Sequence, residues 1–203
     1  MLSSTLTEET PIRESLAKRI FDIGLSSFGI ILFFIPALIF ALAIVLEEWG
    51  PVFYVQDRVG KDGKIFRFYK FRTMRVNADD LPPPENPEDD YRITKVGRFL
   101  RRTAMNELPQ LINILKGDMS FVGPRPDLPE CVEKNSKELP RYHLRHKVRP
   151  GLTGLAQVYA KKNAPERQKL RWDLLYVEKC SLKLDIILIC RSVVRTLKGK
   201  WEL

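Results

Sequence analysis

The sequence predicts a helix-rich α+β protein that is attached to a membrane near its N-terminus. An uncharged, strongly apolar run of 24 residues occupies 23–46, and about 20 apolar residues are enough for a helix to cross a bilayer core. Two short β-strand patterns separated by a glycine-containing turn come next. Helical patterns dominate the rest of the chain. The 203 residues suit one globular unit with appendages, and the sequence contains no evident internal repeat.

The charge of the chain narrows the classes of partner. Lys and Arg number 34 against 25 Asp and Glu, a net charge of +9, which favours phosphates, nucleic acid or an anionic membrane surface. The three cysteines form neither an even set nor a CxxC pair, so a reducing cytoplasmic setting is expected. His143 and His146 lie among basic residues that would repel a metal cation, which favours structural or surface histidines over metal ligands.

The apolar run at 23–46 predicts a membrane segment with a break in it. The run is too long for a cleaved signal peptide, and no small-residue cleavage site precedes the polar chain after it. Basic residues flank it at 13–19 and again at 61–75, and the positive-inside rule places both flanks in the cytoplasm. Pro36 predicts a kink or break near the middle. A straight span with a tolerated proline also fits the pattern, but the symmetric charge favours a segment that enters the membrane and returns.

The C-terminal stretch 182–201 predicts a basic amphipathic helix, because apolar residues recur there at helical spacing between Lys and Arg. Such a helix either lies at the lipid interface or packs on the core with a solvated basic face. The membrane segment elsewhere in the chain favours the interface.

The middle of the chain predicts a small β-hairpin followed by helices. Strand patterns occupy 52–56 and 65–71, with a turn at 60–63. The acidic, proline-rich stretch 79–90 predicts an exposed loop, with metal binding by its carboxylates as a weaker alternative. Helices are predicted at 95–102, 107–116, 129–138 and 166–179.

The helix predicted at 107–116 places two polar residues at its start. Asn106 is expected to be the N-cap, Pro109 is tolerated in the first turn and Gly117 is expected to end the helix. Backbone donors at a helix N-terminus favour anions, so a phosphate-bearing ligand could dock beside Asn106 and Glu107. The alternative is that Asn106 only caps the helix and Glu107 only complements its dipole. The apolar residues Leu108, Leu111, Ile112 and Leu115 are expected to form the buried face.

Three basic motifs accompany this helix. In the turn 123–126, two prolines restrict the backbone around Arg125, and a preset arginine suits bidentate contact with phosphate. Arg149 precedes another proline, and cations alternate with aromatic residues at 69–72. Each motif alone fits a solvated turn or face, whereas together they predict an electropositive site for a diphosphate.

The chain closely resembles the bacterial sugar transferase family of monotopic phosphoglycosyl transferases. The resemblance extends over about 16–194 and rests on four motifs in a fixed order. They are KRIFDIG at 18–24, FYVQDRVGKDGKIFRFYKFRTM at 53–74, NELPQLINILKGDMSFVGPRP at 106–126 and RPGLTGLAQV at 149–158. The length of the chain is similar to that of the minimal catalytic form of the family.

The resemblance implies an enzyme that transfers a sugar phosphate from a UDP-sugar to a polyprenyl phosphate such as undecaprenyl phosphate. UMP leaves and a polyprenyl diphosphate sugar forms, the first membrane step of bacterial glycan assembly. It implies that 1–48 contains a re-entrant membrane helix hairpin and that 49–203 is a catalytic domain on the cytoplasmic face of the inner membrane. Membrane lipids are expected partners. Nucleic acid is not, because no groove-reading motif is present, and the sequence leaves a homo-oligomer open.

The resemblance also assigns roles to residues. Glu107 corresponds to the carboxylate that binds Mg²⁺, and Asn106 stands where the family has its nucleophilic aspartate. An amide is a poor nucleophile, so the alternative is a chain that binds UDP-sugar with impaired catalysis. The remaining substrate-binding residues implied by the motifs are Lys70 and Arg101 at the diphosphate, Arg125 at a phosphate, Arg149 at the nucleotide end, and Asp173 and Tyr176 near the site.

Overall fold

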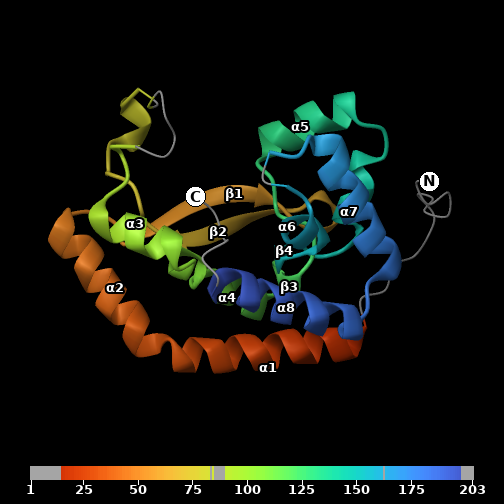
Figure 1. Cartoon of the computed structure of the whole chain (residues 1–203), viewed down its shortest axis with the longest axis horizontal. Helices are drawn as coiled ribbons and strands as arrows, with labels where there is room; N and C mark the ends of the chain where they lie inside the picture. Colours follow the sequence, from red (N-terminus) through yellow and green to blue (C-terminus); the bar gives the residue numbers. More distant parts are fainter. Residues whose placement is uncertain (1–14, 83, 85–89, 162, 198–203) are drawn as a thin grey trace.

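The computed structural model describes residues 15–82, 84, 90–161 and 163–197. Arg13, the positions 83 and 85–89 of the predicted acidic loop, and the end of the predicted helix 182–201 therefore lie outside the described residues. Within them, helices surround two small sheets, so the predicted helix-rich α+β class is confirmed (Figure 1).

The apolar N-terminal segment forms two helices, α1 (Leu16–Leu32) and α2 (Phe34–Glu47), which are bent by 59°. The break falls at Phe33, three residues before Pro36. Pro36 thus lies in the first turn of α2, where its missing N–H would have had no partner within the helix. No single helix in the described part of the chain is long and apolar enough to cross a membrane, whereas the bent pair meets that criterion of length and composition.

The predicted hairpin is confirmed. Strands β1 (Phe53–Val59) and β2 (Ile65–Phe71) pair antiparallel, with Phe53 opposite Phe71. The 3-10 turn Lys61–Gly63 joins them, with positive φ at Asp62 and Gly63. The first strand starts one residue later than expected and continues to Val59.

Three of the predicted helices have the expected bounds: α3 (Lys95–Arg102), α5 (Pro129–Glu138) and α7 (Glu166–Lys179). Helix α8 (Leu182–Leu197) begins where the amphipathic pattern begins. The pattern did not predict α6 (Leu155–Tyr159) or the 3-10 segment η5 (Tyr142–Lys147). Nor did it predict the parallel pairing of β3 (Ser120–Val122) with β4 (Gly151–Thr153), which depends on residues about 30 positions apart.

The prediction for 107–116 was wrong at its start. Helix α4 (Gln110–Lys116) is preceded by a separate 3-10 turn, η4 (Met105–Glu107), and its N-cap position is Pro109 rather than Asn106. Pro109 has no N–H to continue an α-helical ladder, so the amide of Leu108 closes a tighter bond to the carbonyl of Met105.

The predicted buried face of this segment was right for Leu111, which is buried, and for Leu108, which is partly buried against the core, but wrong for its other two residues. Ile112 and Leu115 are exposed, whereas the polar side chain of Asn113 is fully buried. The Asn113 Nδ2 donates to the carbonyl of Arg67, and its Oδ1 accepts from the amide of Tyr69. Asn113 is therefore buried because it satisfies backbone groups at the edge of β2.

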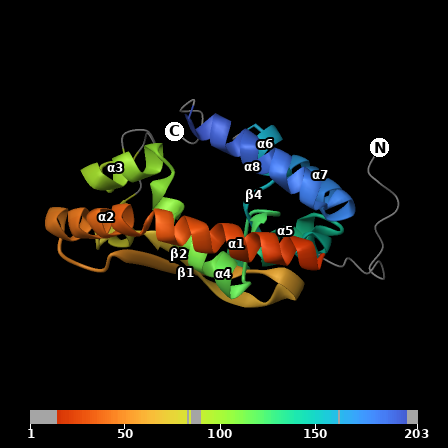
Figure 2. The same ribbon diagram turned by 90° about the horizontal axis from the view of Figure 1, so that it is seen from below.

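Helix α1 turns its polar side toward the protein. Lys18, Asp22 and Ser26 form its buried stripe. The Lys18 Nζ lies 2.6 Å from the Asp185 Oδ2 of α8, and Asp22 accepts from the amide of Phe121. The outer side is apolar. Figure 2 shows α1 running between α4 with the hairpin on one side and α8 on the other.

Candidate active site

A pocket of about 420 Å³ lies where the end of the hairpin, the chain after it, α3 and η4 meet. Four residues predicted for the site line it: Lys70, Arg101, Asn106 and Glu107. The same lining includes Arg72, Thr73, Arg75, Asp79, Phe53 and Tyr54 among its other members. Lys and Arg outnumber Asp and Glu in this lining by four to two, so the pocket suits an anionic ligand.

Glu107 occupies the centre of the charged contacts. Its side chain is 9% exposed, and its Oε1 lies 3.1 Å from both the Lys70 Nζ and the Arg125 Nη2. Burial by itself would raise the pKa of Glu107, but the positive charges of Arg125 and Lys70 outweigh burial and lower this pKa below its ordinary value. Glu107 is therefore a carboxylate held ionised between two cations.

Asn106 lies beside Glu107 in η4 and lines the pocket. Ala104, at the end of the preceding turn, has a φ of 57°, which reverses the chain after α3 and brings η4 back to the hairpin. The amide of Asn106 carries no negative charge. It can donate and accept hydrogen bonds, but it cannot attack phosphorus as a carboxylate does.

Arg101 and Lys70 reach the pocket from two sides. The Arg101 Nε donates to the Thr73 Oγ1 at 3.0 Å, which directs the α3 side chain toward the strand that carries Lys70. The ammonium of Lys70 also lies 5.3 Å from the centre of the Phe68 ring, a cation–π distance. Both cations are thus oriented before a ligand binds.

Arg125 enters the site from the turn 123–126. The pairing of β3 with β4 brings this turn against the Arg149-Pro150-Gly151 segment, and the Gly151 amide donates to the carbonyl of Pro124 at 2.9 Å. A side chain at Gly123 would collide with the carbonyl of Arg149. The glycine is therefore required for the close approach of the two proline-containing segments.

Four predicted site residues lie outside the pocket lining. Arg125 contacts the lining residue Glu107, whereas the other three, Arg149, Asp173 and Tyr176, have their recorded partners elsewhere. The Arg149 Nε donates to the carbonyl of Gly117 at 2.9 Å. Asp173 is buried on α7 and accepts two contacts from Arg145. Tyr176 is buried one turn further on, where its hydroxyl donates to the carbonyl of Val122 and contacts Asp185. The structure therefore assigns these three residues contacts with other parts of the fold and does not place them in the pocket lining.

Sequence patterns predicted only part of the pocket lining. The alternation at 69–72 included Arg72, but Thr73, Arg75 and Asp79 were not predicted as lining residues. Asp79 is the first residue of the predicted acidic loop, so that loop starts at the pocket. The sequence pattern placed Arg145 among the basic residues around His143 and His146 and did not predict its contacts with Arg125 and Asp173.

The donors in the pocket fit Mg²⁺ only in part. In the described residues, no group of three or more His, Cys, Asp or Glu side chains forms a metal site. Mg²⁺, however, is commonly held by one or two carboxylates while phosphate oxygens and water supply the other ligands. Glu107 meets that requirement, with Asp79 in the same lining.

Comparisons with known proteins identify the family of the chain. The family described as bacterial sugar transferase matches residues 13–199. A UDP-N-acetylgalactosamine-undecaprenyl-phosphate N-acetylgalactosaminephosphotransferase from Aeromonas hydrophila is 40% identical over 185 residues, which are 90% of this chain and 44% of that protein. A UDP-glucose:undecaprenyl-phosphate glucose-1-phosphate transferase from Escherichia coli is 39% identical over 95% of this chain and 43% of its own length.

A shorter relative, the exopolysaccharide production protein PSS from Rhizobium leguminosarum, is 41% identical over 90% of this chain and 96% of its own length. The chain thus spans less than half the length of the first two relatives and nearly all of the third. The family match covers most of the chain, including the membrane-segment pattern, the pocket and the turn of Arg125. The chain belongs to the bacterial sugar transferase family.

Proposed function

We propose that this chain transfers a sugar phosphate from a UDP-sugar to undecaprenyl phosphate, with release of UMP. The observation that carries the proposal is the pocket in which Glu107 lies between Lys70 and Arg125, with Arg101 and Asn106 in the same lining. Two phosphate-bearing substrates need such a positive site, because their charges repel each other. The names of two relatives include the same two substrate classes.

The charged residues of the site have different tasks. Lys70, Arg101 and Arg125 hold the diphosphate of the UDP-sugar, and Arg125 provides a planar fork for two phosphate oxygens. In the transfer, the bond between the sugar-bearing phosphorus and the oxygen of UMP breaks, and a bond to an oxygen of the lipid phosphate forms. Glu107 would hold Mg²⁺ together with phosphate oxygens, and the ion would offset the negative charge that gathers there.

Asn106 favours a second candidate function, which is binding of UDP-sugar with impaired transfer. The resemblance implies that an aspartate at this position forms a covalent phosphosugar intermediate, and the amide of Asn106 provides no anionic oxygen for that step. The pocket and its cations serve the binding step equally well in both candidates.

The two candidates are separated by UMP release. The purified chain and its Asn106→Asp version are each mixed with Mg²⁺, undecaprenyl phosphate and a panel of UDP-sugars. Transfer by the native chain predicts UMP from the native protein. UMP release that is at least about 100-fold faster from the Asn106→Asp version indicates instead that the native chain binds UDP-sugar with impaired transfer. UMP from neither protein would sink the proposed transferase.

We propose further that 1–48 attaches the protein to the cytoplasmic face of the inner membrane as a re-entrant hairpin, with 49–203 as the catalytic domain. The outer sides of α1 and α2 support attachment: Ile31 is 77% exposed and Leu46 is 76% exposed, whereas Lys18 is buried. Such an apolar surface is unfavourable in water and favourable in lipid. Helix α8 also exposes Ile186 and Val193.

Vesicle flotation tests the attachment. Leu38→Ser and Leu42→Ser together change two exposed residues of α2 and should reduce flotation with anionic vesicles by at least about half. Ile65→Ser is the control, because Ile65 is 61% exposed but lies on the hairpin. Equal losses in the two proteins would argue against α2 as the attachment surface.

Topology needs a separate measurement. In a Cys180→Ser, Cys190→Ser background, exposed Cys131 reports on the domain, and a cysteine added next to Met1 reports on the other flank. A re-entrant hairpin leaves both protected from a reagent that cannot cross the inner membrane of intact cells. Labelling of only one of them contradicts re-entry.

A further inference from the structure

Arg125 reaches Glu107 from a turn whose main chain is only partly fixed by its sequence. Its side chain is 35% exposed, and a long side chain of this kind has several rotamers available. Pro124 and Pro126 fix their own φ, and Arg125, which precedes a proline, is restricted to extended conformations. The φ restrictions leave the orientation of the peptide planes after Arg125 and Pro126 open, so the hydrogen-bond partners of these two carbonyl groups set it.

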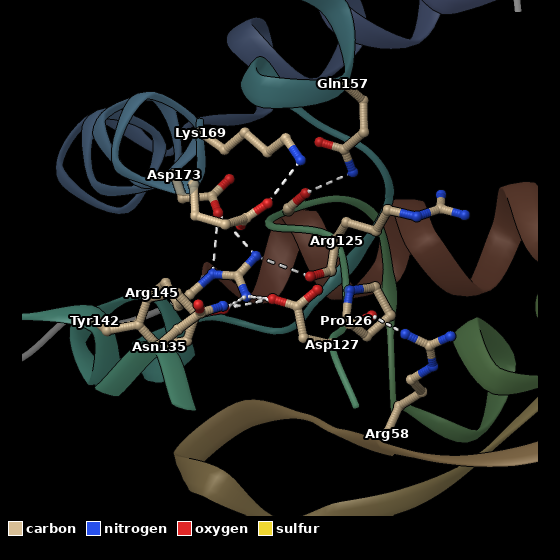
Figure 3. A network of polar contacts seen from close by, with 12 residues as sticks. Arg58, Arg125, Pro126, Asp127, Asn135, Tyr142, Arg145, Gln157, Lys169 and Asp173 are labelled. Carbon is tan, nitrogen blue, oxygen red and sulfur yellow. Dashed lines mark hydrogen bonds and ion pairs between the residues drawn. The ribbon is translucent and has the colours of Figure 1, made fainter. Parts of the chain in front are cut away.

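Those carbonyls bind side chains from other parts of the fold, as Figure 3 shows. The carbonyl of Arg125 accepts from the Arg145 Nη2 at 2.9 Å. The carbonyl of Pro126 accepts from the Arg58 Nη1 at 3.1 Å. Arg145 is therefore the side chain that holds the peptide of the arginine entering the site.

Arg145 is itself held at each guanidinium nitrogen. Its Nε donates to the Asp173 Oδ2 at 2.9 Å, its Nη1 bonds to Asp127, and the same Nη1 lies 2.9 Å from the Tyr142 hydroxyl. Its side chain is 6% exposed and lies over the Tyr142 ring. A planar fork is required for this set of contacts, because a lysine ammonium has no comparable geometry.

Through Arg145, two residues at the turn are connected to α7. Arg145 binds the carbonyl of Arg125 and the side chain of Asp127, which lies on the other side of Pro126. Asp173 on α7 forms an ion pair with the same guanidinium of Arg145. We propose that Arg145 is a positioning residue for Arg125, with Asp173 as its anchor. This inference rests on the proposed function, in which Arg125 binds phosphate.

A merely structural ion pair and a positioning residue make different predictions. Loss of a structural pair would weaken ligand binding whether or not Arg125 has its side chain. Loss of a positioning residue weakens binding only through Arg125, so its effect disappears once the Arg125 side chain is removed.

The test is a double-mutant cycle in the affinity for UDP, measured by calorimetry in the full chain. Arg145→Lys should weaken UDP binding about tenfold in the native background and less than about twofold in the Arg125→Ala background. Arg195→Lys is the matched control. Arg195 also donates to main-chain carbonyls, those of Gln157 and Val158 on α6, and its substitution should change UDP affinity by less than about twofold in either background.

A second variant covers the case in which Arg145→Lys fails to fold. Asp173→Asn keeps the shape of the anchor and leaves Arg145 paired with Asp127, and it should weaken UDP binding about threefold, again only when Arg125 is present. UDP binding by the native chain with equal losses in the two backgrounds overturns the positioning role alone. Absence of UDP binding by the native chain overturns the proposed function and this inference together.

Discussion

Two ion-pair clusters contact Arg125 of the turn 123–126, one through its side chain and one through its carbonyl, and their compositions are reversed. In the first, one carboxylate, Glu107, lies between the cations Lys70 and Arg125. In the second, one cation, Arg145, lies between the carboxylates Asp127 and Asp173. The first cluster borders the pocket, and its cations are 21% and 35% exposed, whereas Arg145 is 6% exposed.

The difference shows that ionic contacts alone do not identify a binding site. A cluster in which cations exceed carboxylates and reach a pocket has the right charge for an incoming phosphate. A cluster closed around a buried guanidinium satisfies its own donors, so it does not bind an incoming phosphate itself. The pKa values follow the surroundings. The pKa of Glu107 is lowered, whereas burial raises the pKa of Asp173 to about 6 even though Arg145 opposes the rise.

The largest expected difference between the clusters is in stability. Arg145→Met leaves the buried Asp173 and the partly buried Asp127 without their shared cation and should lower the free energy of unfolding by about 3–5 kcal/mol. Lys70→Met changes a partly exposed cation and should cost less than about 1 kcal/mol. Urea titration of both proteins in detergent measures the two changes. Losses of similar size in the free energy of unfolding would contradict the distinction between the clusters.

A second difference is expected in catalysis. Glu107→Gln, made in whichever of the native and Asn106→Asp proteins releases UMP, should reduce the rate by at least about 100-fold, because the carboxylate proposed to hold Mg²⁺ loses its charge. Its free energy of unfolding should change by less than about 1 kcal/mol, since Lys70 and Arg125 can turn toward water. A variant that retains its rate would remove Glu107 from the mechanism.

A smaller effect is expected in the pH dependence of stability, and it concerns His146, whose pKa is affected by the charge of Arg145. Burial and the charge of Arg145 lower the pKa of His146 from 6.5 to about 4. The stability contributed by neutral His146 is therefore fully present above pH 6.5 and is lost progressively as the pH falls from 6.5 to about 4. Between about pH 7.5 and about pH 5, the native chain should lose about 2 kcal/mol relative to His146→Phe. Parallel pH profiles of the two proteins in urea titrations would show that His146 stays unperturbed.

Local sequence predicted a large part of the fold and the core of the site. The bounds of α3, α5 and α7 follow from helical spacing over consecutive residues, and the hairpin follows from its turn. Lys70, Asn106 and Glu107 were predicted from local patterns, the family resemblance added Arg101, and the structure brings all four into one pocket.

The features that sequence missed depend on contacts between distant residues. Asn113 is buried because the edge of β2 needs hydrogen-bond partners, and no pattern within α4 contains that information. Asp173 was assigned to the site by resemblance, but its partner Arg145 lies 28 residues away in sequence. A carboxylate on a helix reveals neither whether it faces a ligand nor whether it anchors an arginine that faces one.

The most direct test of the difference between the clusters is the affinity of the Lys70→Met chain for UDP, measured by calorimetry beside the native chain. Removal of one cation from the pocket cluster should weaken UDP binding about tenfold, with the free energy of unfolding preserved to within about 1 kcal/mol. An affinity equal to that of the native chain would contradict the assignment of the Glu107 cluster as the diphosphate site.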